Sequence, residues 1–179
     1  MVQRYALPLR ILHWLMAALF IGMLALGLFM TTMPLSPAKL QVYSWHKWIG
    51  MSLFFLVLIR IIIRLSLKAP GQLEHMSPLS RRLAKIGHVL LYILMLAAPL
   101  SGWLMSSAKG FQTVWFGVIP LPDLIGKNLA LGENLVLVHH WVNYLFIAVI
   151  AGHVLAALKH HFIDKDPIFK RISLSSAKE

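Results

Sequence analysis

Four long apolar stretches divide the 179-residue chain. Each is long enough to cross the hydrocarbon core of a bilayer, which takes about 20 residues of helix. The pattern predicts an all-α fold in which one transmembrane four-helix bundle occupies residues 1–179. The predicted helices cover about 11–30, 45–67, 83–105 and 135–158.

The segments between these stretches are rich in Pro, Gly and Ser, as turns require. The last connection, 106–134, is long enough to contain a short surface helix or strand. Arg4 and Arg10 precede the first apolar run and resemble the start of a signal peptide. That run is about twice the usual signal length and has no clear cleavage site, so we interpret it as an uncleaved first helix.

Basic residues predict the orientation of the bundle, because Lys and Arg accumulate on the cytoplasmic side of membrane proteins. The predicted topology assigns thirteen of them to one side and four to the other. Both termini are therefore predicted to lie in the cytoplasm. The four on the opposite side are Lys39, Lys47, Lys109 and Lys127, and the thirteen include Arg4, Arg10, Arg60, Arg64, Arg81, Arg82 and Lys178.

The amino-acid composition limits the environment and the kinds of cofactor that suit this chain. Apolar residues make up 59% of the chain and charged residues 13%, which suits a lipid bilayer rather than water. The net charge of +11 does not indicate nucleic acid, because the basic residues flank apolar spans instead of sharing one solvated face. The absence of cysteine excludes iron–sulfur clusters and c-type haem attachment, so any metal chemistry must depend on histidine.

Nine histidines are unusual in so apolar a chain, because ionisable groups at membrane depth are costly and mark function. No Asp or Glu falls inside the four spans, so a carboxylate proton relay is poorly supported. Three histidines lie outside the spans: His75, His160 and His161. Six lie in or near them: His13, His46, His88, His139, His140 and His153.

The spacing in the fourth span predicts two sites at different depths. His139 and His153 are fourteen residues apart, so they share one helix face and are separated by about 21 Å along the axis. His140 points elsewhere, because it is rotated by about 100° from His139. At equal depth, His46 can meet His139 and His13 can meet His153. Two histidines per iron leave no open position, which suits electron transfer through haem.

Three other groups of residues have open interpretations. His88 competes with His13 as partner of His153; we favour His13, and His88 is then an interfacial residue or a hydrogen-bond partner of a haem propionate or ligand. Arg60 lies level with the inner site and either binds a propionate or snorkels to the headgroups. Several glycines leave room either for a porphyrin or for close helix packing: Gly22, Gly27, Gly50, Gly102 and Gly152.

These features resemble the bacterial cytochrome b-561 family, diheme proteins related to the cytochrome b subunits of nickel hydrogenases and formate dehydrogenases. The resemblance spans all four predicted helices. It is carried by Leu12-His13-Trp14, the segment 46–64 with Arg60, Gly87-His88, the run from His139 to Gly152-His153, and the tail 157–166.

The resemblance implies a bacterial inner-membrane protein with two b-type haems per chain. In this arrangement the ligand pairs join the first helix to the fourth and the second to the fourth, and electrons pass between an outer-side donor and the quinone pool. Some members oxidise superoxide and reduce ubiquinone. For this chain that is a hypothesis, as is attraction of superoxide by the outer lysines. The family similarity also makes His160 a candidate quinone contact, although a solvated interfacial role is the alternative.

Two other functions remain to be distinguished. The chain could be a cytochrome anchor subunit that docks a soluble dehydrogenase or hydrogenase, and the long outer connection 106–134 leaves that open. A zinc protein or small transporter is less well supported, because structural zinc prefers clustered tetrahedral ligands. The predicted ligands instead form two pairs about 20 Å apart along one helix.

Overall fold

The computed structural model describes residues 3–68, 70–71 and 77–175; His75 and Lys178 lie outside these ranges. It confirms the all-α prediction, with four helices long and apolar enough to cross a membrane. These are α1 (Leu7–Thr32), α2 (Pro37–Ser66), α3 (Pro78–Ala108) and α4 (Leu129–Phe162). The smaller elements are strands β1 (Val114–Trp115) and β2 (Ile119–Pro120) and the short helix α5 (Ile168–Ile172).

All four long helices begin earlier than the hydrophobic pattern predicted, at residues 7, 37, 78 and 129 rather than 11, 45, 83 and 135. Polar capping residues explain three of these extensions. The side chains of Ser36, Ser77 and Asn128 accept hydrogen bonds from the backbone N–H three residues later. Caps stabilise helix starts without being apolar. A hydropathy pattern therefore misses the first turns.

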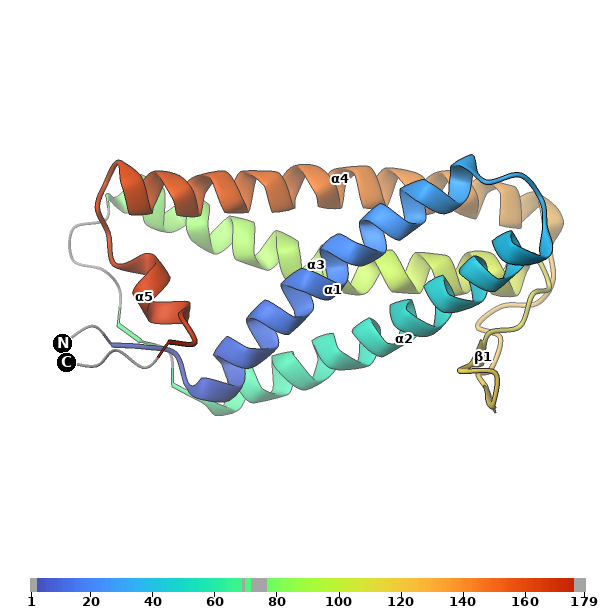
Figure 1. Ribbon diagram of the computed structural model, residues 1–179, viewed down its shortest axis with the longest axis horizontal. Coiled ribbons are helices and arrows are strands. Elements are labelled where there is room, and N and C mark those ends of the chain that lie inside the picture. Colours follow the sequence, from blue (N-terminus) through green and yellow to red (C-terminus); the bar gives the residue numbers. More distant parts are fainter. Residues whose placement is uncertain (1–2, 69, 72–76, 176–179) are drawn as a thin grey trace.

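The helices run alternately up and down, so both ends of the chain lie at one end of the bundle (Figure 1). We call this the terminal end, and the opposite end, with β1 and β2, the hairpin end. Backbone hydrogen bonding joins the two chain segments, because Tyr5 N donates to Arg171 O over 3.1 Å. Arg10 and Trp14 also donate to the carbonyls of Ser173 and Ile172. Which end faces the cytoplasm stays a prediction.

The connection 106–134 contains a two-stranded antiparallel hairpin, in which Val114 pairs with Pro120 and Trp115 with Ile119. This confirms the expectation of a short surface element. Phe116 and Gly117, at the turn, have φ angles of 52° and 72°. Two consecutive residues with positive φ match the right-handed twist of tight hairpins.

The helices do not pack equally against one another. Helix α4 lies close to α3, α1 lies close to α2, and α2 also contacts α3. The backbone of α4 scarcely approaches α1 or α2, and buried side chains fill that space. Phe20 of α1 meets Phe146 of α4 edge to face, with ring centroids 5.2 Å apart. The wide separation of α4 from α1 and α2 leaves room for histidine side chains between them.

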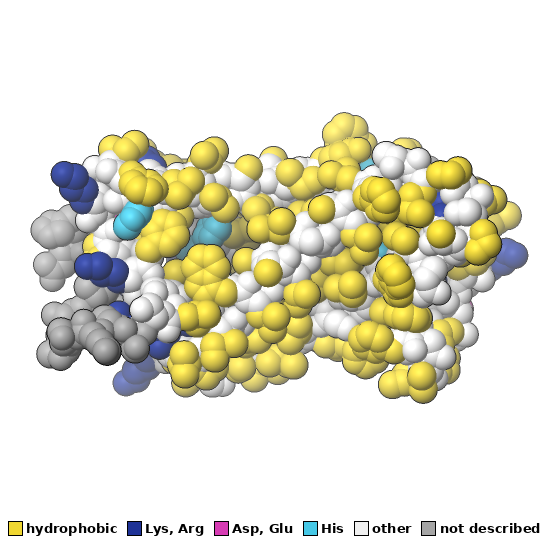
Figure 2. Space-filling model, in the orientation of Figure 1, with side chains coloured by type: hydrophobic (Ala, Val, Ile, Leu, Met, Phe, Trp, Pro, Cys, Tyr) yellow, Lys and Arg dark blue, Asp and Glu magenta, His cyan; other side chains and the backbone are white. Residues whose placement is uncertain are grey.

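The outer surface suits lipid. Large apolar side chains are exposed along the spans, and Figure 2 shows them covering the middle of the molecule while visible Lys and Arg lie toward its ends. Trp141, Leu155 and Ile62 are examples, with 70%, 65% and 63% exposure. In water such a surface would aggregate. The lipid bilayer is therefore a partner of this protein.

Shortening Phe146 should destabilise the bundle, because this side chain is 1% exposed and bridges α4 to α1. For Phe146→Ala we expect a loss of about 3 kcal/mol in the free energy of unfolding. The matched control is Leu155→Ala on the lipid-facing surface of the same helix. Unfolding of both variants would be followed by circular dichroism in detergent. An equal loss of stability in the two would contradict the packing of Phe146 between α4 and α1.

Candidate functional site

Two pairs of histidines face each other across the bundle, one pair near each end. At the hairpin end the ring centroids of His46 and His139 lie 6.4 Å apart, and at the terminal end those of His13 and His153 lie 6.3 Å apart. A metal–imidazole bond of about 2.0 Å puts the centroids of two rings on one metal about 6 Å apart. Both pairs therefore have the separation that one iron between two imidazoles needs.

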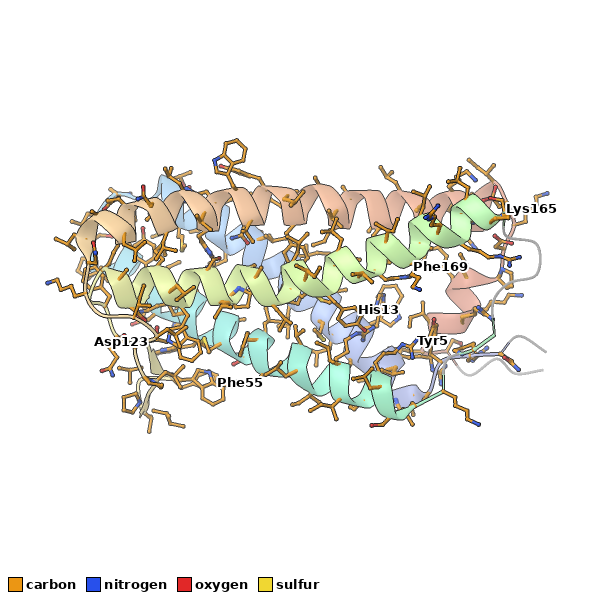
Figure 3. All side chains as sticks on the ribbon, turned by 180° about the vertical axis from the view of Figure 1, so that it is seen from behind. Tyr5, His13, Phe55, Asp123, Lys165 and Phe169 are labelled. Carbon is orange, nitrogen blue, oxygen red and sulfur yellow. The ribbon has the colours of Figure 1, made fainter. Side chains whose placement is uncertain are left out.

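The pairing follows from the antiparallel topology. Figure 3 shows His13 within the bundle toward the terminal end, on the same side as Phe169 and far from Asp123. His46 comes early in α2, which starts at the hairpin end, and both pairs take their second ring from α4. Fourteen residues of α4 separate those two rings, so they share a face. His140 lies on an exposed face, as its rotation predicted.

His46 has a buried ring nitrogen, Nδ1, without a hydrogen-bond partner in the described structure. A buried polar atom of this kind is costly and usually indicates a missing water or ion. The His46 ring also lies against bare backbone, since a Cβ added at Gly27 would come 3.3 Å from its Cε1. The open nitrogen and the close-fitting ring position are what an axial ligand requires.

His139 is oriented by a serine of α3. Ser101 Oγ donates to the carbonyl of Ala98 over 2.8 Å and lies 2.9 Å from His139 Nδ1. Because its only proton is used, Ser101 can only accept from Nδ1–H, and Nε2 is left unprotonated. Asn143 Nδ2, which donates to the carbonyl of His139 over 2.7 Å, lies 3.3 Å from that Nε2. Orientation of one nitrogen by a hydrogen bond while the other binds metal is a common arrangement.

Gly102 faces His139 as Gly27 faces His46. A Cβ added at Gly102 would lie 3.1 Å from His139 Cε1, tighter than ordinary van der Waals contact. Added Cβ atoms at Gly22 and Gly152 would meet nothing within 4 Å. Two of the glycines expected to make room for a porphyrin thus make room for the histidine rings themselves.

A small cavity of about 40 Å³ adjoins the hairpin-end pair. Phe20, Met23 and Phe146 are among the residues that line it, together with His46 and His139. A porphyrin is much larger than this space, so side chains must move aside to admit one. Met23 is suited to this, because methionine has three flexible torsions and tolerates repacking.

At the terminal end a third histidine joins the pair. His88 of α3 lies 5.5 Å from His153 between ring centroids, closer than His13 does, and its side chain is more exposed. Trp14 packs edge to face on His13 at 5.2 Å. The structure therefore brings together His13, His88 and His153, and proximity alone does not choose the partner of His153.

Arg60 lies among the helices near this group. Its Nη1 donates to the carbonyl of Leu9 on α1 over 3.1 Å, and its Nε to the hydroxyl of Tyr92 on α3 over 3.3 Å. Leu9 and Tyr92 are each one turn from a histidine of the group, His13 and His88 respectively. Arg60 thus cross-links three helices at the depth predicted for it, rather than snorkelling outward.

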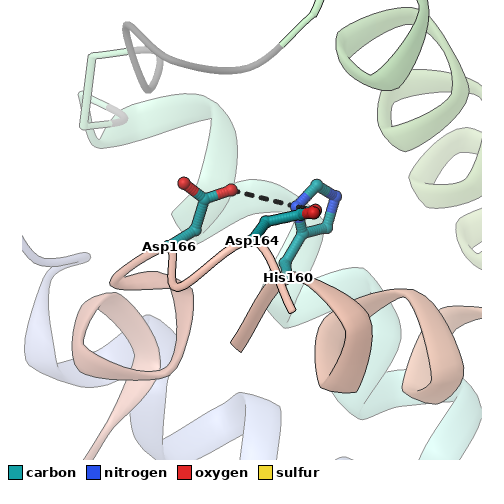
Figure 4. Close-up of side chains that lie close together, drawn as sticks. All are labelled: His160, Asp164 and Asp166. Atoms are coloured by element: carbon teal, nitrogen blue, oxygen red, sulfur yellow. Dashed lines mark hydrogen bonds and ion pairs between the residues drawn. The ribbon is translucent and has the colours of Figure 1, made fainter. Parts of the chain in front are cut away.

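His160 lies just before the end of α4, apart from both pairs, and carboxylates surround it (Figure 4). Its Nδ1 is 2.9 Å from Asp164 Oδ2 and 3.0 Å from Asp166 Oδ2. The Lys159 ammonium donates to both oxygens of Asp164 and lowers the pKa of that carboxyl. The sequence pattern did not predict these partners. The signal was present, because Asp164 and Asp166 follow His160 by four and six residues.

Comparison with known proteins decides the family. A model of the prokaryotic cytochrome b561 family matches residues 4–173. The chain belongs to the prokaryotic cytochrome b561 family. This cytochrome is thus a multi-pass bacterial membrane protein that transfers electrons with b-type haem.

Curated relatives agree with the assignment. Cytochrome b561 homolog 2 of Escherichia coli (strain K12) is 34% identical over 99% of this chain and 95% of its own length. A Yersinia pestis protein named "Probable superoxide oxidase CybB" is 32% identical over 72% of this chain and 74% of its own. Cytochrome b561 homolog 1 of Escherichia coli (strain K12) is 30% identical over 76% of this chain and 77% of its own.

Removing the Ser101 hydroxyl should change a haem potential. In Ser101→Ala the His139 ring loses the serine acceptor and keeps only its bond to the Ala98 carbonyl, so an iron held by this imidazole would receive less electron density. We expect the reduction potential of one haem to rise by on the order of tens of mV in a redox titration. Ser44→Ala is the control, because that hydroxyl donates to the carbonyl of Leu40 within α2. Equal potentials in Ser101→Ala and the native protein would contradict the assigned hydrogen bond.

Proposed function

We propose that this cytochrome carries electrons between the two ends of the bundle through two b-type haems. One is held by His46 and His139, and the other by His13 and His153. The observation that carries the proposal is the matched separation of the two pairs, 6.4 and 6.3 Å between centroids. When bound, each haem supplies a one-electron ferric–ferrous couple without an open coordination position.

The choice of His13 over His88 rests on geometry and surroundings. The His13 ring reproduces the separation of the hairpin-end pair, whereas the His88 ring is nearer to His153 and more exposed. The His13 ring also packs edge to face on Trp14. His88, whose ring already bonds to the backbone of Ala84, is then a neighbour of the inner haem and not its ligand.

Arg60 is proposed to neutralise a propionate of the inner haem. Its guanidinium already lies among α1, α2 and α3 and spends two of its five N–H groups on neutral acceptors. A carboxylate is a stronger acceptor than a carbonyl or a phenol, and arginine binds carboxylates with two parallel bonds. The remaining donors therefore suit a propionate.

For orientation, we propose that the terminal end faces the cytoplasm and that the membrane is the bacterial inner membrane. Thirteen basic residues belong to that side of the topology and four to the other. This asymmetry follows the positive-inside rule. The hairpin end would then receive electrons from the outer side.

The donor proposed for the hairpin end is superoxide. The Yersinia pestis relative carries that activity in its name. Lys47 adjoins His46 in sequence and carries positive charge there, part of which Asp123 offsets. The charge of Lys109 is offset by Glu133 at 3.0 Å. Each superoxide would lose one electron and leave as dioxygen. Two such electrons with two protons convert one quinone to a quinol.

The acceptor proposed for the terminal end is a membrane quinone such as ubiquinone. A surface hollow of about 290 Å³ lies there, lined by Trp14, Phe169, Ser173 and Leu174. Trp14 contacts His13, so a quinone in this hollow would lie next to the inner haem. His160 and its carboxylates, at the same end, are proposed to contact the quinone or exchange protons with it.

The second function that the sequence left open is that of an anchor subunit, which would dock a soluble dehydrogenase or hydrogenase. Within the connection 106–134, the hairpin packs on the side of α2 and does not stand above the bundle, where a soluble partner could dock. We therefore retain direct oxidation of a small donor as the proposal.

Loss of one ligand should remove one haem. In His153→Ala we expect the haem content to fall from two per chain to one in a pyridine haemochrome assay, because the other histidines of α4 lie at different depths along the helix. His140→Ala, on the exposed face, should keep both. His13→Ala should lose a haem and His88→Ala should not. Two haems in His153→Ala would disprove the ligand assignment.

Filling the terminal hollow should impair quinone reduction without touching the haems. Leu174 is 50% exposed and lines the hollow, so Leu174→Trp should raise the KM for ubiquinone several-fold at unchanged haem content. The control is Leu35→Trp in the loop at the other end, where the side chain is 84% exposed. Equal quinone kinetics in proteoliposomes for both variants would place the quinone elsewhere.

A further inference from the structure

The hairpin has a tip made of apolar side chains. No charged residue occurs from Phe111 to Pro122. Phe116, Val118 and Ile119 are 56%, 78% and 51% exposed. Contiguous apolar groups of this size on a loop are unfavourable in water and mark an interaction surface. The haem function described above makes no use of them.

The hairpin lies beside α2 and not beyond its end. Trp48 Nε1 donates to Val114 O over 2.6 Å, and Trp115 Nε1 to Trp48 O over 3.2 Å. The rings of Trp115 and Phe55 are 5.5 Å apart, and Figure 3 shows Phe55 on the hairpin side of α2. Since α2 begins at Pro37, these contacts lie about 16 to 27 Å along the helix.

The position of the hairpin along α2 corresponds to a definite depth in the bilayer. From Trp48 to its last residue, Ser66, α2 is about 28 Å long, close to the thickness of a hydrocarbon core. The hairpin tip is held at the level of Trp48, because Phe116 lies 5.8 Å from the Trp48 ring. The tip is therefore at the boundary between headgroups and acyl chains. Tryptophan is enriched at this boundary in membrane proteins.

The hairpin also packs on the lipid side of the bundle. Trp48 follows His46 by two residues, which is about 200° around the helix. The face of α2 that carries the hairpin is thus turned away from the hairpin-end histidine pair. On that face of α2 the Trp48 ring lies against Phe116 of the tip. A soluble electron donor would approach the end of the bundle and not this side.

Several backbone N–H groups of the hairpin are paired within it. Gly117 N donates to Val114 O and Val118 N to Trp115 O, each over 3.1 Å. Leu121 N donates to Thr113 O over 2.9 Å. Unpaired backbone groups prevent irregular segments from entering lipid. With these N–H groups satisfied inside the turn, the tip can enter the interface at low cost.

We propose that residues 111–122 form an interfacial membrane anchor. Its tip, Phe116 to Ile119, is buried in the lipid interface at the hairpin end. Its partner is the phospholipid leaflet on that side, at the level where acyl chains begin. Through Trp48 and Trp115 the anchor fixes the depth of α2 in the bilayer. The inference is independent of the donor and quinone proposed above.

The absence of cysteine allows a direct test in the haem-loaded protein. Val118→Cys is placed in nanodiscs, which leave both bilayer faces open, and is treated with a sulfonated maleimide or a lipophilic one. Lys127→Cys, in the exposed loop, is the aqueous reference, and Ile62→Cys on α2 is the lipid reference. Because Val118 has 78% exposure, its substitution disturbs no packing, and unchanged haem content confirms folding.

We expect the sulfonated reagent to label Val118→Cys several-fold more slowly than Lys127→Cys, while the lipophilic reagent labels it readily. Rapid labelling by the sulfonated reagent, at the rate of Lys127→Cys, would mean that the tip is in water and would overturn the proposal. Protection from both reagents would mean that protein covers the tip, and would overturn it in favour of a contact between copies of the chain.

Discussion

Two imidazole rings on one face of α4 organise this protein. His139 and His153 are fourteen residues apart, and each must find a partner away from water, because an unsatisfied imidazole at membrane depth is costly. His46 and His13 meet them at 6.4 and 6.3 Å from two different helices. The wider separation of α4 from α1 and α2 gives these rings the space they occupy between the helices. The closely packed helix pairs are instead α3 with α4 and α1 with α2.

The two ends of the bundle hold their histidine pairs in different surroundings. At the hairpin end Ser101 and two glycines hold the rings tightly, which suits a site whose potential is set by hydrogen bonding. At the terminal end a third histidine, Trp14 and Arg60 lie near the pair. Hydrogen bonds from Arg10 and Trp14 fasten the C-terminal segment there. This end has the hollow, the carboxylates and the exchangeable groups that reduction of a quinone would use.

The hairpin adds a connection between the fold and the bilayer. Its tryptophans attach it to α2, while its tip contributes apolar surface at the depth where the span begins. An electron carrier that works across a membrane must keep each redox centre at a fixed distance from the surface it serves. A lipid anchor on the helix that carries His46 would hold that distance at the hairpin end.

Hydropathy and helical periodicity alone determined the four spans, the shared face of His139 and His153 and the outward direction of His140, because these depend on residues within one helix. The early helix starts at Ser36 and Asn128 were missed, since caps are polar and local. Only the tertiary structure brought Ser101 to His139 and two carboxylates to His160, and only it placed both His13 and His88 beside His153. Such contacts join different helices or follow a helix end, and the angle at which segments pack is set by the whole core rather than by any one stretch of sequence.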